Sequence, residues 1–357
     1  MSACTNAGKD PPHVNDAPAS VDSIDGADAE TFANEIAPRY RPVVMRGLVA
    51  EWPAVAAGRS GPGATAAYLK ALDGGATTTV FSAPPEAQGR FFYAEDMRGL
   101  NFGTQKVSLS RLVDALVSLA EDPAPPALYA GATPTADSLA AFSAANRMLL
   151  ATPGGEPRIW VGNASRIATH YDMQDNIACV VAGRRRFTLF PPDQIGNLYV
   201  GPVDRTPAGQ PVSMVDPLRP DLDRYPRFAA AMEHALVADL EPGDAIFVPS
   251  MWWHHVRASA PLNVLVNYWY GQHAERSPFA ALMHATYAIR ELPSAERASW
   301  RAWFEHYVFG DAAPEAVSHL PEHARGVLGA PSASRDEMIK AYVVQALAGH
   351  CEPPQAH

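Results

Sequence analysis

Residues 242–256 read PGDAIFVPSMWWHHV, and this stretch decides the fold class. It opens on a turn signal, continues as a short apolar run, and ends in a second run that carries two adjacent histidines. The same alternation of short apolar runs and turn residues extends over residues 127–270, for example in RIWVGN, NIACVVAG, RRFTLFPP and NVLVNYWYG. Many short strands separated by turn signals are typical of an antiparallel sandwich or barrel. We therefore expect a mainly β domain.

Other patterns flank this region. Toward the N-terminus we expect helices at 28–37, 64–73 and 107–120 and strands at 41–49, 77–83 and 90–95. After residue 271 the strand pattern stops, and helices are expected at 277–291, 294–308 and 335–349. The first 22 residues are polar and rich in Pro, Asp and Asn, which is typical of disorder. These patterns divide the chain into a tail at 1–22, a main domain at 23–275 and a helical region at 276–357.

Composition excludes several classes of protein. The 357 residues carry a net charge of −10 with a pI of about 5.6, which is unlike a nucleic-acid-binding surface. We find no run of about 18 apolar residues, so we expect no membrane span. The N-terminal sequence has no apolar core of a secretory signal. Three widely spaced cysteines, Cys4, Cys179 and Cys351, predict no disulfide framework. We therefore expect a cytoplasmic protein without nucleic-acid or membrane partners.

A candidate metal site begins in residues 168–176, ATHYDMQDN. In an extended segment, side chains two residues apart share a face, so His170 and Asp172 point the same way. The paired histidines His254 and His255 offer a third ligand. Two imidazoles and one carboxylate form the facial triad of non-haem Fe(II) oxygenases, which leaves three positions open for a bidentate co-substrate and O₂. Alone, the HxD tripeptide also fits a surface turn and the paired histidines also fit a core, but their combination favours a metal site.

The passages HYDMQDN, GRRRFTLFPPDQIGNLY, PGDAIFVPSMWWHHV and NVLVNYWYG resemble the JmjC/cupin-8 family of Fe(II)- and 2-oxoglutarate-dependent oxygenases. The resemblance covers residues 28–275 and is nearest to the branch with the asparaginyl hydroxylase of hypoxia-inducible factor. It implies a double-stranded β-helix, with iron held by His170, Asp172 and His254 and with His255 turned to the other side of its strand. It also implies that 2-oxoglutarate and O₂ are used to hydroxylate a protein side chain or a small molecule.

The distal carboxylate of 2-oxoglutarate needs a cation inside the barrel, because an unpaired buried charge is costly. In the strand candidate around Phe187 and Leu189, alternation places Arg185 on the same face as these apolar residues. The family usually carries Lys at this position, so the chain departs from the pattern. An arginine can still form a bidentate pair with a carboxylate. The resemblance implies three further co-substrate contacts, from Asn176, Asn267 and Tyr129.

The prime substrate is not defined by the sequence. As candidates for a substrate pocket we take Trp269, Trp160, Tyr93 and Arg205. The asparaginyl hydroxylase grips its target amide with polar residues, whereas Pro211 and Val212 fill those places here. Asparagine specificity is therefore not expected. If the oxidised carbon were an N-methyl group, hydroxylation would lead to demethylation.

Two other functions remain open. One is a metal-binding cupin that acts as a sensor or structural protein, which Arg185 in the usual Lys position favours. The other is a cupin enzyme that uses no 2-oxoacid. Succinate production that depends on O₂ separates both from the oxygenase.

The C-terminal segments SPFAALMHATYAIREL and ASWRAWFEHYVFG carry many apolar residues for an appendage. In the proteins that the chain resembles, C-terminal helices form dimers. We therefore expect a homodimer through residues 276–357, against the alternative that these helices cover the outside of the barrel.

Overall fold

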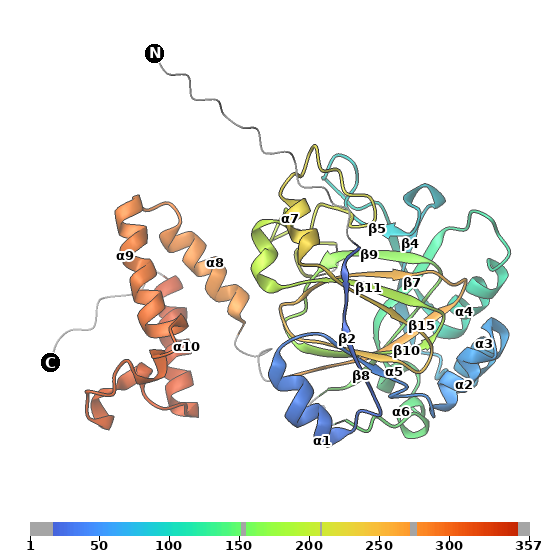
Figure 1. Cartoon of the computed structure of the whole chain (residues 1–357), viewed down its shortest axis with the longest axis horizontal. Helices are drawn as coiled ribbons and strands as arrows, with labels where there is room; N and C mark the ends of the chain where they lie inside the picture. The colour runs from blue at the N-terminus through green and yellow to red at the C-terminus, as the bar shows by residue number, and fades with distance from the viewer. Residues whose placement is uncertain (1–16, 151–154, 208, 272–276, 349–357) are drawn as a thin grey trace, which may run out of the picture. The chain divides into compact units, whose positions relative to one another are not determined.

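Two β-sheets form the body of the protein, as a computed structural model shows (Figure 1). The structure describes residues 17–150, 155–207, 209–271 and 277–348. The first sheet has 6 strands, in the order β1 (Ala19–Ser20), β12 (Leu236–Leu240), β11 (Arg185–Phe190), β14 (Trp253–Ala258), β9 (Ser165–His170) and β5 (Arg90–Phe91). The second has 9 strands, in the order β2 (Asp22–Asp25), β3 (Val43–Arg46), β13 (Ala245–Val248), β10 (Asp175–Ala182), β15 (Asn263–Tyr270), β8 (Pro157–Gly162), β7 (Ala127–Pro134), β4 (Thr77–Ala83) and β6 (Gly103–Ser108). Neighbouring strands are antiparallel except in the pairs β1–β12, β2–β3 and β5–β9.

A hydrophobic cluster lies between the two sheets. Phe187 and Leu189 of β11 in the first sheet pack there with Ala178 and Val180 of β10 and Leu265 of β15 in the second. Side chains alternate along a strand, so every second residue of these strands enters the shared interior. The prediction of a mainly β, double-stranded β-helix fold is confirmed.

Helices of the main body are short, and the longest begin at clear sequence signals. Pro62 opens α3, directly after Gly61, and the Ser108 side chain accepts the backbone N–H of Arg111 at the start of α4. The α-helices are α1 (Ala29–Thr31), α2 (Pro53–Arg59), α3 (Pro62–Leu72), α4 (Leu109–Ser118), α5 (Thr135–Ser138), α6 (Phe142–Ala145) and α7 (Phe228–Glu233). Single π- or 3₁₀-turns are η1 (Phe32–Ile36), η2 (Ala37–Arg39), η3 (Pro85–Ala87) and η4 (Pro192–Gly196).

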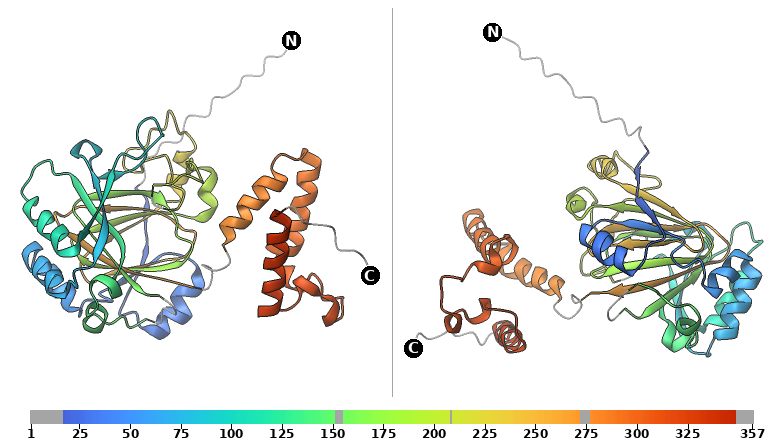
Figure 2. Two further views of the ribbon diagram at one scale, coloured as in Figure 1. Left: turned by 180° about the vertical axis from the view of Figure 1, so that it is seen from behind. Right: turned by 60° about the horizontal axis from the view of Figure 1, so that its bottom comes forward.

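Three of these helices cover the outer face of the second sheet (Figure 2). Val55 of α2, Leu69 of α3 and Leu112 of α4 belong to one buried cluster with Ile177 and Val181 of β10. Strand β10 is therefore buried on both faces. Double burial explains why its sequence, NIACVVA, is continuously apolar where a half-exposed strand would alternate.

Several expected elements differ from those observed. The strand expected at 77–83 is present as β4. The helix expected at 107–120 begins only at Leu109, because the residues before it form strand β6, which pairs with β4. The strand expected at 90–95 ends after Phe91. Of the expected tail at 1–22, residues 1–16 lie outside the described residues, and Ala19–Ser20 pairs with β12 as β1. Within residues 19–22, Ala19–Ser20 and Asp22 thus take part in strand pairing, where the polar composition had indicated disorder.

Contacts divide the chain into Met1–Glu275 and Arg276–His357. In the second unit the helices are α8 (Pro278–Ile289), α9 (Ser294–Phe304), the π-turn η5 (Glu305–Phe309), the 3₁₀-turns η6 (Ala313–Glu315), η7 (Glu322–Ala324) and η8 (Gly326–Leu328), and α10 (Ala333–Leu347). Large apolar side chains of this unit are exposed, such as Tyr287 at 84%, Trp303 at 60% and Phe309 at 71%. Among the described residues, no helix has the length and apolarity that would let it cross a membrane.

Candidate metal centre

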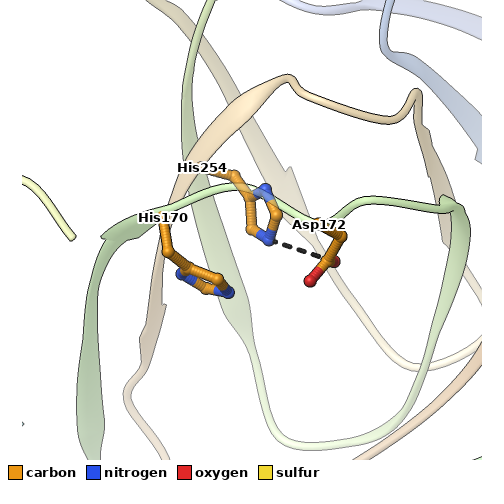
Figure 3. Close-up of side chains that lie close together, drawn as sticks. All are labelled: His170, Asp172 and His254. Carbon is orange, nitrogen blue, oxygen red and sulfur yellow. Dashed lines mark ion pairs between the residues drawn. The ribbon is translucent and has the colours of Figure 1, made fainter. Parts of the chain in front are cut away.

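His170, Asp172 and His254 lie together in the main body, as Figure 3 shows. His170 is the last residue of β9 and Asp172 follows it, while the antiparallel register of β14 with β9 sets His254 opposite His170. One potential ligand atom from each residue lies within 4.8 Å of the other two. Nε2 of His254 is 3.6 Å from Oδ2 of Asp172, and the two imidazole centroids are 4.3 Å apart. Strand pairing therefore brings two distant segments to one point.

The backbone orients both imidazoles. Nδ1 of His170 lies 2.8 Å from the carbonyl oxygen of Ala168, and Nδ1 of His254 lies 3.0 Å from that of Trp252. A carbonyl oxygen only accepts, so each Nδ1 carries the hydrogen and each Nε2 keeps the lone pair that a metal needs. Burial, and then the neighbouring His170, lowers the pKa of His254, which keeps this imidazole neutral. This donor set fits a divalent metal such as Fe(II).

A chain of side-chain hydrogen bonds holds the carboxylate. Oδ2 of Asp172 accepts Nδ2–H of Asn176 at 3.1 Å and the indole N–H of Trp269 at 3.0 Å. Asn267 donates to Oδ1 of Asn176 at 3.2 Å, and the indole of Trp160 donates to Oδ1 of Asn267 at 2.7 Å. The two asparagines, expected as co-substrate contacts, are thus joined to each other and to the candidate ligand. Such outer hydrogen bonds restrict how a carboxylate meets its metal.

An inner cavity of about 60 Å³ adjoins the three candidate ligands. All four residues that the resemblance assigned to the co-substrate line it: Arg185, Asn176, Asn267 and Tyr129. Arg185 is only 5% exposed, its Nε has no hydrogen-bond partner, and within the described part of the chain no carboxylate forms an ion pair with its guanidinium. Burial lowers the pKa of Arg185 to about 10, partly offset by Tyr129, so the group stays charged at neutral pH. A buried cation without a counter-ion indicates a site for an anion.

An outer cavity of about 290 Å³ shares a wall with the inner one, formed by Tyr129, Trp160, Ile167, His170, Asp172 and Trp269. Its other lining residues are Phe81, Phe91, Phe102, Gly131, Ala132, Ala168, Pro207, Gln210 and Val212. The two tryptophans proposed for a substrate pocket therefore line both spaces.

Tyr93 and Arg205, also expected at the substrate pocket, line neither cavity. The Tyr93 side chain is buried against Phe92 and Val212, and its hydroxyl donates to the carbonyl oxygen of Arg205 at 2.7 Å. Through this bond Tyr93 holds the backbone of a neighbouring loop, and Arg205 contributes its carbonyl oxygen. A part of either residue in substrate binding stays a prediction.

Comparison with known proteins shows which family the chain belongs to. Residues 29–276 match the model of the cupin-like domain. The chain belongs to the cupin-like domain family. The JmjC/cupin resemblance is thereby confirmed, while the finer placement near the asparaginyl hydroxylase stays a prediction.

Curated relatives resemble part of this cupin-like protein. It is 35% identical to human HSPB1-associated protein 1 over 118 residues. This aligned stretch covers 32% of this chain and 24% of the relative. It is 37% identical over 112 residues to the lysine-specific demethylase JMJ31 of Arabidopsis thaliana, and the alignment covers 31% of this chain and 20% of the relative. It is 34% identical over 121 residues to Jumonji C domain-containing protein 5 of Drosophila melanogaster, and the alignment covers 33% of this chain and 29% of the relative. The matched part thus spans less than a third of each relative.

His255 lies on the other face of β14 of the cupin-like fold. Its side chain is buried, and burial lowers its pKa, while Asp216 and Arg166 are among the charges that it senses. The Asp216 carboxylate forms an ion pair with Arg166 at 3.0 Å, and it is not one of the candidate ligands. Of the two adjacent histidines, only His254 therefore reaches the cluster.

Sequence reasoning missed the phenylalanines of the outer cavity, Phe81, Phe91 and Phe102. Two of them lie in strands that were expected, at 77–83 and 90–95. Alternation assigns such residues to one face of a strand, but the strand order decides what that face meets. Because β5 pairs in parallel with β9, Phe91 lies beside Ile167 on the wall of the cupin cavity.

Proposed function

We propose that this protein is an Fe(II)- and 2-oxoglutarate-dependent oxygenase that hydroxylates a protein side chain or a small molecule. The observation that carries the proposal is Arg185, a buried guanidinium without a carboxylate partner among the described residues, on the wall of the same cavity as His170, Asp172 and His254. A dicarboxylate that reaches a metal at one end and a cation at the other matches this pair of features.

His170, Asp172 and His254 would hold the iron, which supplies oxidation of an unactivated C–H bond by O₂ coupled to decarboxylation of 2-oxoglutarate to succinate. Arg185 binds the distal carboxylate with its planar fork. Burial raises the pKa of Tyr129, so its hydroxyl stays protonated and donates a hydrogen bond to the same carboxylate.

Asn176 and Asn267 have a double role in this proposal. They keep the Asp172 carboxylate oriented through their hydrogen bonds, and the second N–H of each amide is left for the co-substrate in the inner cavity, which both residues line. Aromatic walls exclude water from the reacting carbon, which strengthens these polar contacts.

The names of the relatives favour a protein substrate, because one is called a lysine-specific demethylase and another HSPB1-associated protein 1. Demethylation begins with the same hydroxylation, at an N-methyl carbon. This chemistry belongs to the relatives by name, and for this chain it remains one outcome of the proposed activity.

The proposal is tested by adding Fe(II) and then 2-oxoglutarate to the anaerobic protein, watching for the visible charge-transfer band of the chelate. O₂ is then admitted and succinate is assayed. We expect the band and slow succinate release in the native chain, loss of both in His170→Ala, and loss of the 2-oxoglutarate response with retained iron in Arg185→Ala. Iron binding without band or succinate would contradict the oxygenase and favour the sensor or the cupin enzyme without a 2-oxoacid.

We also propose that the chain forms a homodimer through residues 276–357. The exposed aromatic residues Tyr287, Trp303 and Phe309 are the support, since large apolar side chains gathered on one small unit are commonly covered by a partner.

A further inference from the structure

The outer cavity has an almost entirely uncharged wall. Asp172 is its one charged side chain among the described lining residues, and Oδ2 of that carboxylate already accepts two N–H groups. The other polar groups on the wall, apart from His170, are the Gln210 amide, the Tyr129 hydroxyl and two indoles. Both indole N–H groups are used, by Asp172 and by Asn267. A charged substrate group would lose its hydration here without gaining a counter-ion.

Aromatic rings make up much of this wall and lock each other in place. Phe81, Phe91 and Phe102 form edge-to-face contacts at 5.4–6.5 Å between ring centroids. Trp160 and Trp269 meet at 5.7 Å with an interplanar angle of 89°. Rings fixed in this way present a preformed apolar surface, which binds an apolar group with little loss of side-chain entropy.

Aromatic faces also attract cations, so a methylated ammonium group is the competing occupant. The charges near the cavity oppose it. The guanidinium of Arg158 lies 5.8 Å from the Trp269 ring centroid, Arg185 is buried behind the shared wall, and the candidate triad would carry a divalent cation. Without the co-substrate, these positive charges outnumber the single carboxylate of the chain, Asp172.

A bulge in β7 borders the outer cavity, which Gly131 and Ala132 line. Pairing of β7 with β8 loses its register between Ala130 and Thr133, and Ala132 there has a φ of 50°. Nη1 of Arg158 donates to the carbonyl oxygen of Ala132 at 3.1 Å and holds the bulge. A Cβ on Gly131 would stand 3.0 Å from the rings of Trp160 and Tyr129, so a larger residue there would require these rings to shift. Bulges beside active sites commonly shape the adjoining pocket.

We infer that the group oxidised by this protein is uncharged and apolar, a single aromatic ring or a branched aliphatic side chain, held in the outer cavity between the phenylalanines and the tryptophan pair. That the bound group is oxidised rests on the proposed function. That it is uncharged and apolar rests on the residues of the cavity itself. At about 290 Å³, the cavity is at the small end of ligand pockets, in keeping with one side chain.

The test measures binding of four probes to the full chain with Zn(II) in place of iron: N-acetylphenylalaninamide, N-acetylleucinamide, N-acetyllysinamide and N-acetylaspartamide. Ligand-observed saturation-transfer NMR gives each dissociation constant. We expect the two apolar amides to bind at about the millimolar level and at least about tenfold more tightly than the two charged ones. Equal or tighter binding of the lysine or aspartate probe, or no detectable binding of either apolar probe, would overturn the inference.

Variants locate the binding. Ala132→Phe projects a ring into the outer cavity and is expected to weaken the apolar probes by about tenfold or more. Ala132→Gly removes a methyl group and relieves the positive φ, so it should leave their binding within about twofold. Circular dichroism reports folding of both variants, and if Ala132→Phe does not fold, the charge preference in the native chain still decides. Unchanged apolar binding in a folded Ala132→Phe would place the probes elsewhere and overturn the inference.

These readouts need neither O₂ nor 2-oxoglutarate, so failure of the proposed function is seen separately. An absent charge-transfer band with a preserved apolar preference would refute the oxygenase alone. A normal band with a preference for the charged probes would refute the apolar class alone.

Discussion

The indole nitrogen of Trp269 lies 3.0 Å from Oδ2 of Asp172, the same oxygen that is 3.6 Å from Nε2 of His254. A residue proposed from the sequence for substrate contact is thus a direct partner of a candidate metal ligand. Trp269 lies on β15, which pairs with β10, and this pairing brings the indole to the Asp172 carboxylate.

Trp269→Phe removes that donor and keeps an aromatic ring. Since partners of ligating carboxylates tune metal affinity, we expect Co(II) or Fe(II) to bind about 10- to 100-fold more weakly. Anaerobic metal titration measures this. Tyr93→Phe, which loses a hydroxyl bonded to Arg205, is the control and should bind metal normally. Equal affinity in both variants would show that the indole bond has no influence on the metal.

Arg185→Met removes a buried cation that lacks a carboxylate partner among the described residues. We expect 2-oxoglutarate binding to be lost, while the free energy of unfolding without ligand rises by on the order of 1–3 kcal/mol, because desolvation of the charge is no longer required. Isothermal titration and urea unfolding measure the two effects. Arg185→Lys keeps the charge without the planar fork and should bind about tenfold more weakly than the native chain. A destabilised Arg185→Met would point to a structural partner for the guanidinium.

Anion binding by Arg185 should depend on pH in one direction. Burial lowers the pKa of this guanidinium to about 10, so the cation is present below that pH and is lost as the pH rises through it. Glutarate, which carries two carboxylates but no keto group, is therefore expected to bind the metal-free chain with constant affinity between about pH 7 and 9 and more weakly above about pH 10. Calorimetry at several pH values checks this, with Arg185→Met as a control that binds at none of them. An affinity that rises above pH 10 would contradict this role.

Asp216→Asn should destabilise the fold. The Arg166–Asp216 pair, at 3.0 Å, is largely buried with side-chain exposures of 16% and 12%, so its loss should cost about 1–3 kcal/mol. Asp239→Asn is matched to it, because the Arg186–Asp239 pair at 3.2 Å is exposed at 44% and 67% and should cost less than about 0.5 kcal/mol. Urea denaturation compares them. Similar losses in both variants would mean that burial does not set the strength of these pairs.

The homodimer prediction concerns the second unit. The native chain should sediment at twice 38.3 kDa, and Trp303→Glu, at an exposed aromatic position, should shift it toward one chain. Sedimentation at several concentrations tests both. Lys106→Glu, an exposed charge change in β6 of the main body, should leave the mass unchanged. A native mass of a single chain would refute the dimer.

Local pattern was enough for the fold class and for much of the candidate site. Turn residues between short apolar runs indicate strands, and alternation alone places His170 and Asp172 on one face and Arg185 among inward apolar residues. The choice of His254 over His255 came from family resemblance. In the structure, His254 is the one that joins the cluster.

Tertiary structure decided which faces meet. The pairing of β14 with β9 sets His254 opposite His170, and the pairing of β15 with β10 brings Trp269 to Asp172. It also bonded the Tyr93 hydroxyl to the backbone of Arg205 and placed Phe81 on the wall of the outer cavity. Sequence periodicity is a property of one strand and determines which side chains share its face. Neighbours across a sheet follow from strand order and register, which the burial of all the strands together selects.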